Sequence, residues 1–281
     1  MKGVSKPLKE KIVNIDTKYR IDYDYTSYAS ANMVFGEKLS EVRSMEVVSI
    51  DIPITFYNIF ANNDCQQTGN NYVRIKNGGS SKILTLTPNY YTDLSFVAEI
   101  NTQLQNLSLS SDISYSIVNN KSLFKSKVTT YSFATNVDMC GNVYELNNQN
   151  NLGWVMGFRD TSYNLTTSGL TSESIVSLKT PRHLFLALNE FSQGNSNSFV
   201  SPSERTNQSK NIIAKICIPS TVKFGDTLCV NKANGLLVSE VRKYLEKVNI
   251  QRMNLQLLDD AGRVIHLNGT DFSVCLKLVH E

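Results

Sequence analysis

The sequence is poor in charge, in paired cysteines and in long apolar runs, and each shortage excludes a class of protein. Charged residues make up 19% of the 281 positions, below the roughly 25% of an ordinary soluble protein, and Asn, Ser and Thr replace them. The net charge of +3 lacks the clustered Lys and Arg that a nucleic-acid groove requires. We therefore expect no specific nucleic-acid partner.

The cysteines are odd in number and show no CxxC pair or zinc-ligand spacing among the five. We interpret them as free thiols of a protein assembled in a reducing compartment. The first residues lack the apolar core of a signal peptide, and no later apolar run approaches the ~20 residues of a membrane helix. We expect no transmembrane segment, and contact with an internal membrane is not indicated.

Residues in catalytic or metal-binding patterns are also missing. The histidines follow no HExxH or Ser/His/Asp pattern, and neither a GxSxG elbow nor a P-loop occurs. Asp22 and Asp24 lack the third ligand group that a cation needs. The sequence therefore predicts a non-enzyme, with no catalytic, metal-binding or cofactor-binding residue and no cofactor.

Alternating apolar and polar residues predict strands in most of the chain, most clearly at its C-terminal end. Residues 272–279 alternate with period two, which indicates a strand with one buried face. Residues 248–257 change parity near Gln251, which predicts a bulge. Turn-forming residues at 259–262 and 268–269 separate a short middle strand from both neighbours. We predict a three-stranded antiparallel meander here.

Further strands and one helix are expected upstream. Thr92 is a candidate helix N-cap, and it precedes a stripe of apolar residues with helical spacing. Residues 234–247 fit a helix and a strand equally, so both interpretations stay open. The helical stripe consists of Val97, Ile100, Leu104 and Leu107, and the strands are expected at residues 12–15, 33–35, 42–54, 72–76, 82–87, 113–118, 123–124, 128–137, 184–188 and 212–218.

These elements predict a mainly β protein, an antiparallel β-sandwich with one or two inserted helices. Residues 12–281 would form the sandwich, with a helix-containing insertion at about 88–150. Residues 1–11 form a basic arm without apolar periodicity, which we expect to be flexible or to become ordered on a neighbouring subunit or an acidic surface. Its lysines are candidate assembly contacts: Lys2, Lys6, Lys9 and Lys11.

The only tryptophan lies between two glycines that allow a sharp turn or a close backbone approach. Trp154 and Phe158 are the largest apolar side chains nearby, and Arg159 follows them. We expect this segment to plug one end of the sandwich. The GxGxxG spacing and the following Lys-Ser/Thr pair of a phosphate cradle are missing.

Three stretches together resemble capsid proteins of large double-stranded DNA viruses of algae and amoebae, in particular their minor capsid group. The resemblance spans about two thirds of the chain in the right order, and it departs at Asn89, where the family pattern has Gly. The stretches are Thr87–Thr92 with Ile100-Asn101, Asn151–Trp154 with Gly157–Arg159, and the C-terminal segments 242–244, 248–250, 257–263 and 267–273.

The resemblance implies a minor capsid protein of jelly-roll type that cements or supports the major capsomers of an icosahedral shell. It implies the major capsid protein and other minor capsid proteins as partners, and a virion location after assembly in the host cytoplasm. Besides Trp154, Phe158 and Arg159, Asp271 and Phe272 are the motif residues that we single out as structural. A jelly roll would place residues 272–279 beside 33–35 or 42–52.

Two other functions stay open. A carbohydrate-binding sandwich, such as a virion receptor-binding protein, would need exposed aromatic platforms, and Tyr23, Tyr25 and Tyr28 are the candidate cluster. A sandwich hydrolase would need two carboxylates within ~10 Å in a cleft, and this separation is set by the fold rather than by sequence spacing.

Overall fold

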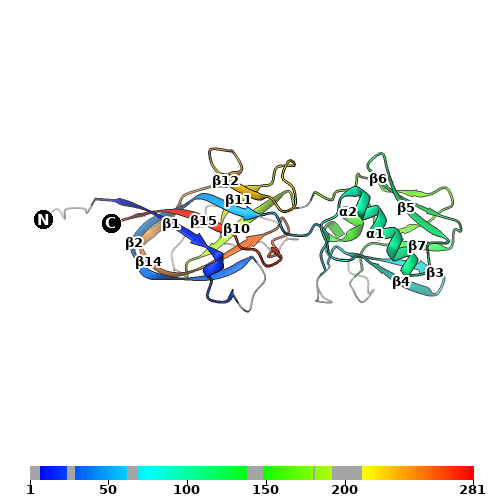
Figure 1. Cartoon of the computed structure of the whole chain (residues 1–281), viewed down its shortest axis with the longest axis horizontal. Helices are drawn as coiled ribbons and strands as arrows, with labels where there is room; N and C mark the ends of the chain where they lie inside the picture. Colours follow the sequence, from blue (N-terminus) through cyan, green and yellow to red (C-terminus); the bar gives the residue numbers. More distant parts are fainter. Residues whose placement is uncertain (1–6, 24–28, 62–68, 138–147, 180, 192–210) are drawn as a thin grey trace. The chain divides into compact units, whose positions relative to one another are not determined.

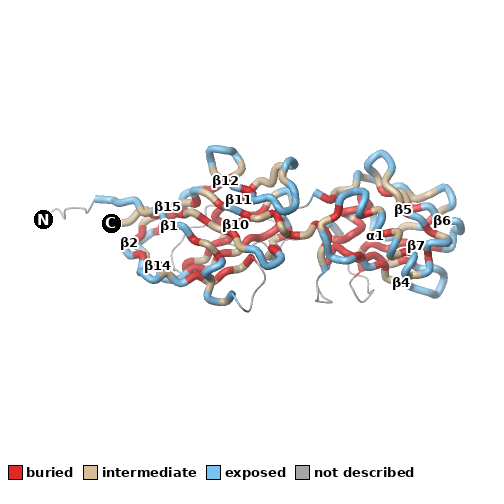
Figure 2. The backbone as a smooth tube through the Cα atoms, in the orientation of Figure 1, coloured by how far each residue is buried: buried red, intermediate tan, exposed pale blue. Residues whose placement is uncertain are grey.

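The computed structural model describes residues 7–23, 29–61, 69–137, 148–179, 181–191 and 211–281. The fold is mainly β, with antiparallel sheets in a curled, sandwich-like arrangement and two α-helices in the described part, which confirms the predicted fold class. The chain divides into unit 1, Met1–Phe56 with Pro181–Glu281, and unit 2, Tyr57–Thr180 (Figure 1). Buried residues gather inside each unit (Figure 2).

Unit 1 contains an eight-stranded sheet in the order β1-β15-β2-β14-β10-β11-β13, with β12 paired to β2. The first part of β2 pairs with β14, while its last part lies between β15 and β12. The sheet therefore curls around one apolar core. Its strands are β1 (Lys9–Asp16), β2 (Ser30–Pro53), β10 (His183–Asn189), β11 (Ile212–Cys217), β12 (Thr227–Asn231), β13 (Leu237–Ser239), β14 (Arg242–Leu258) and β15 (Ser273–His280).

Bulges allow the two longest strands to bend around this core. The register of β14 on β2 shifts between Ile250 and Arg252, so the predicted bulge near Gln251 is confirmed. On β2, Glu41 has a positive φ of 56°, and the extra residues increase the local twist. The two strands predicted at 33–35 and 42–54 are parts of this one strand.

The C-terminal strand pairs with an early strand, as predicted. β15 lies between β1 and β2, with Ser273 opposite Asp51 and His280 opposite Val42. The predicted meander is wrong, because β2 separates β14 from β15. In the described residues, the predicted middle strand is reduced to an isolated β-bridge between Leu258 and Val264. Side-chain alternation specifies which face of a strand is buried, but it does not specify which strand will be its hydrogen-bonding partner.

Residues 237–239 and 242–247 form strands after a turn at 234–235, so the helical interpretation is wrong. They contribute to β13 and to the start of β14. Arg242 and Tyr244 are buried while Lys243 is exposed, which is the period of a strand. Val241, which the helical stripe would bury, is exposed.

Unit 2 has its own core and two small sheets, ordered β4-β3-β7-β8 and β5-β6-β9. The expected insertion at about 88–150 lies inside this unit, whose bounds are wider on both sides. The predicted hairpin at 72–87 and strand at 113–118 are confirmed. The elements are β3 (Tyr72–Asn77), β4 (Ser80–Thr85), α1 (Asp93–Asn106), β5 (Ile113–Val118), β6 (Lys121–Ser126), β7 (Tyr131–Ala134), α2 (Leu152–Val155), β8 (Ser162–Asn164) and β9 (Leu170–Thr171).

Helix α1 begins at a capping box and covers the core of unit 2. The Ser95 N–H donates to Thr92 Oγ1 at 3.4 Å, and the Thr92 N–H donates to Ser95 Oγ at 2.9 Å, which confirms the predicted N-cap. Phe96, Ile100 and Leu104 are fully buried. Ile100 and Leu104 of the predicted stripe are thus buried as expected, whereas Val97 and Leu107 are partly buried and Phe96 is the additional core residue.

Candidate functional site

Strand β1 forms one edge of the sheet of unit 1 and is a candidate contact surface. The Thr17 N–H, directly after β1, donates to the Phe272 carbonyl at 3.0 Å. Antiparallel ladders alternate inward and outward backbone groups, so the N–H and C=O groups of Glu10, Ile12 and Asn14 point away from β15. Ile12 is 60% exposed. This edge therefore offers unpaired backbone groups beside an exposed apolar side chain.

Residues 9–11, which the sequence assigned to the basic arm, belong to a strand instead. Lys9 and Lys11 belong to β1, opposite His280 and Leu278, because backbone pairing with β15 requires no apolar side chain. Lys11 Nζ lies 3.5 Å from the Glu37 carboxylate. Lys2 and Lys6 lie outside the described residues.

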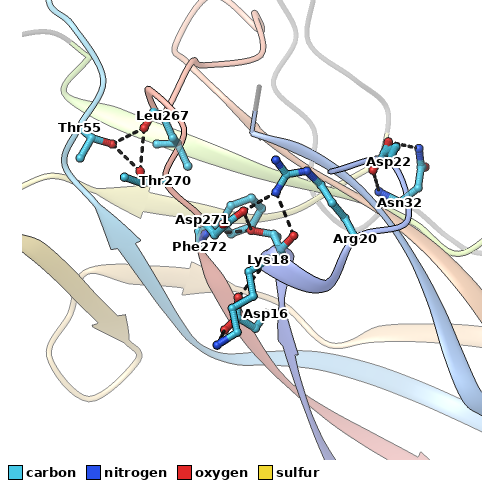
Figure 3. Close-up of polar contacts among 11 residues, drawn as sticks. Asp16, Lys18, Arg20, Asp22, Asn32, Thr55, Leu267, Thr270, Asp271 and Phe272 are labelled. Atoms are coloured by element: carbon cyan, nitrogen blue, oxygen red, sulfur yellow. Dashed lines mark hydrogen bonds and ion pairs between the residues drawn. The ribbon is translucent and has the colours of Figure 1, made fainter. Parts of the chain in front are cut away.

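A largely buried ion pair joins the chain after β1 to the turn that precedes β15 (Figure 3). Arg20 pairs with Asp271, and their side chains are 7% and 18% exposed. Arg20 also donates to the Thr17 carbonyl at 3.0 Å, and Thr17 Oγ1 donates to Asp271 at 3.2 Å. The Phe272 N–H donates to Thr17 Oγ1 at 3.0 Å, and the Phe272 ring is buried in the core. These contacts give both predicted motif residues a structural role.

The turn before β15 is fastened to the end of β2 (Figure 3). Thr55 Oγ1 donates to the Leu267 carbonyl at 2.7 Å and lies 2.7 Å from Thr270 Oγ1. Asn268 and Gly269 have positive φ values of 51° and 80°, as a tight hairpin-type turn requires. The C-terminal motif therefore consists of residues that hold β15 against β2.

Tyr23 is the described member of the expected tyrosine cluster. The Arg20 guanidinium lies over its ring at 4.2 Å, so a cation–π contact occupies one ring face. Tyr25 and Tyr28 lie outside the described residues. The aromatic platform for carbohydrate stays a prediction.

In unit 2, the glycine-flanked tryptophan segment forms a short helix with an arginine stacked on it. The Arg159 guanidinium lies 3.9 Å from the Trp154 ring centre and donates to the Trp154 carbonyl at 3.0 Å. Phe158 is fully buried in the core of unit 2, where its ring lies 5.1 Å from that of Phe133. Trp154 is half-buried. Phe158 therefore fills a core, and Trp154 positions Arg159 at the surface.

A tyrosine and a glutamate complete this surface. The Tyr163 hydroxyl donates to Glu173 at 2.8 Å and accepts from the Arg159 N–H at 2.9 Å. Burial, reinforced by the Glu173 charge, raises the pKa of Tyr163 to about 12. The tyrosine stays protonated at physiological pH, so this group acts as a fixed hydrogen-bonded brace.

The two flanking glycines are packing requirements. A Cβ on Gly157 would lie 2.2 Å from the Ser174 carbonyl oxygen, and its φ is +93°. A Cβ on Gly153 would lie 2.2 Å from Thr135 Cγ2. The spacing of these glycines follows from close packing inside unit 2 rather than from binding a phosphate group.

A second buried ion pair has no signature in the sequence. Arg242 lies 2.7 Å from the Glu190 carboxylate, with side chains 2% and 0% exposed. Arg242 also donates to the Leu188 and Asn211 carbonyls at 2.9 and 3.1 Å. It therefore ties β14 to the end of β10 and to the residue before β11. Its only sequence signal is the alternation of its strand, which places it on the buried face.

Titratable groups elsewhere form no recognisable reaction centre in the part of the chain that the structure describes. Burial and Lys215 lower the pKa of His183, while burial and Asp259 raise that of Asp260. In the described ranges, no three His, Cys, Asp or Glu residues are grouped in a way that could hold a metal ion. Neither helix of the described part is long and apolar enough to cross a membrane.

The predicted free thiols are confirmed for the described cysteines. Cys217, Cys229 and Cys275 form no disulfide. Cys65 and Cys140 lie outside the described residues.

Comparison with known proteins identifies the fold and leaves the sequence without a matching family. No family model matches the sequence, and no curated protein matches it. Among solved structures, the crystal structure of a selenomethionine-labelled mavirus penton protein has a similar fold, with a TM-score of 0.50 and 12% sequence identity. The match covers 97% of this chain and 99% of the penton chain.

Replacing Asp271 should destabilise unit 1. The Asp271→Ala variant leaves the buried Arg20 guanidinium without its counter-ion, so we expect the free energy of unfolding to fall by about 2–3 kcal/mol. Urea unfolding followed by circular dichroism measures this change. Glu37→Ala removes the exposed partner of Lys11 as a control and should change the free energy by less than about 0.5 kcal/mol. Equal effects of both substitutions would contradict the structural role.

Replacing Gly157 should destabilise unit 2. In Gly157→Ala the new methyl group meets the Ser174 carbonyl, and the backbone keeps an unfavourable positive φ. We expect a loss of at least about 2 kcal/mol of unfolding free energy, measured by thermal and urea unfolding. Gly79→Ala, with no atom within 4 Å of the new Cβ, is the matched control. A near-neutral Gly157→Ala would show that this turn relaxes freely.

Proposed function

We propose that this protein is a structural subunit of an icosahedral virus capsid. The observation that carries the proposal is the similarity in fold to a penton protein over nearly the full length of both chains. The sequence stretches that resemble capsid proteins support the same proposal. The proposed location is the virion, after assembly in the host cytoplasm.

Within the capsid we propose a minor role rather than that of the major capsid protein. Unit 1 contains one curled sheet of eight strands. The double jelly roll of a major capsid protein would need two sandwiches of about this size. The partners would then be the major capsid protein and other minor capsid proteins. The likeness to a penton protein favours a vertex position over a cementing position between capsomers.

We assign the β1 edge as one assembly contact. Its outward backbone groups favour the addition of an extended segment from a neighbouring subunit. Such a contact depends little on net charge, which suits a chain with 19% charged residues. Lys2 and Lys6, which lie outside the described residues, stay proposed as further assembly contacts.

Quantitative mass spectrometry of purified virus particles tests the capsid role. The protein should be present at a fixed ratio to the major capsid protein, well below equal copy number. Cryo-microscopy of the same particles would then separate vertex from cementing positions. Trace amounts that wash away with salt would contradict a structural role.

A proline on the β1 edge should separate folding from assembly. Ile12→Pro removes an N–H that points away from β15, so unit 1 should keep its melting temperature within a few degrees while incorporation into particles falls. Val13→Pro is the matched control, because it removes an N–H of the β1–β15 ladder and should destabilise unit 1. Normal incorporation of Ile12→Pro would refute the edge contact.

Deletion of residues 1–6 tests the arm separately. The deletion leaves β1 intact, so unit 1 should fold normally while assembly weakens. Loss of the folded unit on this deletion would refute the arm interpretation.

A further inference from the structure

Unit 2 has a surface hollow lined by residues of the β5–β6 hairpin and of two neighbouring connections; Figure 1 shows where β5 and β6 lie in the unit. The volume of the hollow is about 380 Å³, which falls in the range of small-molecule sites. Its lining includes hydroxyl groups from Ser110, Ser114 and Thr167 and ammonium groups from Lys125 and Lys127. These residues come from the α1–β5 connection, the hairpin and the β8–β9 connection, which are separate parts of the chain.

The hairpin register directs these side chains to one face. Ser114 stands opposite Lys125, and Ile113 stands opposite Ser126. Ile113 and Ser126 are buried, whereas Ser114, Lys125 and Lys127 are exposed. Because alternate residues of a strand share a face, the two lysines and Ser114 project together on the solvent side.

The two lysines lack a counter-ion in the described part of the chain. Other lysines form ion pairs, such as Lys277, whose ammonium group lies 2.7 Å from the Glu10 carboxylate. The one carboxylate in the hollow, Asp112, is already engaged, since it accepts from the Tyr131 hydroxyl at 2.8 Å and from Ser111 Oγ at 3.2 Å. The hollow is therefore lined by two lysines and one carboxylate, which leaves it with a net positive charge.

The hydroxyl groups in the hollow are also available. Among the described residues, the side chains of Ser110, Ser114 and Thr167 have no hydrogen-bond partner. Hydroxyl groups both donate and accept, so they match a ligand that itself carries several hydroxyl groups. Lysine ammonium groups favour an anionic oxygen, and charge-assisted hydrogen bonds are the stronger ones.

We propose that this hollow binds an acidic saccharide, whose carboxylate or sulfate group lies between Lys125 and Lys127 while its hydroxyl groups pair with Ser110, Ser114 and Thr167. The site gives unit 2 a ligand-binding role in addition to the proposed capsid role of the chain. It differs from the expected tyrosine platform in both place and chemistry, because it relies on charge and hydroxyl groups rather than on ring stacking.

Titration calorimetry of the full chain with defined saccharides tests the proposal. N-acetylneuraminic acid supplies a carboxylate, a sulfated disaccharide supplies sulfate groups, and lactose is the neutral control. We expect an acidic sugar to bind, to bind more weakly as salt concentration rises, and to exceed both lactose and inorganic sulfate in affinity. The comparison of the two acidic sugars identifies the anionic group.

Charge-removing variants locate the site. Lys125→Gln and Lys127→Gln should each weaken binding about tenfold, the scale of one charge-assisted hydrogen bond. Lys76→Gln removes an exposed lysine of the same unit, on another sheet, and should leave the affinity unchanged. Circular dichroism should show all three variants folded, since these side chains are exposed.

Several outcomes would overturn the proposal. They are the absence of binding by either acidic sugar at millimolar concentration, equal affinity for lactose, equal affinity for inorganic sulfate, or unchanged affinity in the Lys125→Gln and Lys127→Gln variants. Each leaves the capsid proposal standing, because particle composition is measured independently of saccharide binding.

Discussion

The pairing of β15 with β2 is the contact on which unit 1 depends. It joins the last strand of the chain to the longest one, and Ser273 donates to Asp51 across 222 residues of sequence. β1 can form only because β15 offers its second edge. The Arg20–Asp271 pair and the Thr55–Leu267 contact both hold the chain just before β15, so the exposed β1 edge is a consequence of how the C-terminal strand is positioned.

Unit 2 is stabilised in a different way. Its core contains a group of contacting aromatic rings, with Phe124 lying 5.1 Å from Phe133 and 4.9 Å from Tyr115. Tilted rings at this separation interact favourably beyond their buried area. Close packing around Gly153 and Gly157 brings the tryptophan turn onto this core. The outer face of the β5–β6 hairpin is exposed to solvent, so Ser114 and Lys125 are accessible to a ligand.

The two proposed roles use different physical means. An open sheet edge offers backbone hydrogen bonds, which are nearly independent of sequence and suit repeated contacts between identical or related subunits. A hollow lined by hydroxyl and ammonium groups selects a ligand by charge and hydrogen-bond geometry. The low overall charge favours this division, because the few unpaired charges then dominate the field at their own site.

The sequence by itself determined the local features of this protein. The strand alternation of residues 272–279, the helix N-cap at Thr92 and the bulge near Gln251 each depend on neighbouring residues, so pattern and propensity were enough to predict them. The tertiary structure decided the rest. It inserted β2 between β14 and β15, extended β1 to Lys9, paired Arg242 with Glu190 and, within the described residues, left Lys125 without an ion pair. Period-two alternation specifies a buried face, whereas strand partners and charge partners depend on which distant segments the shared core brings together.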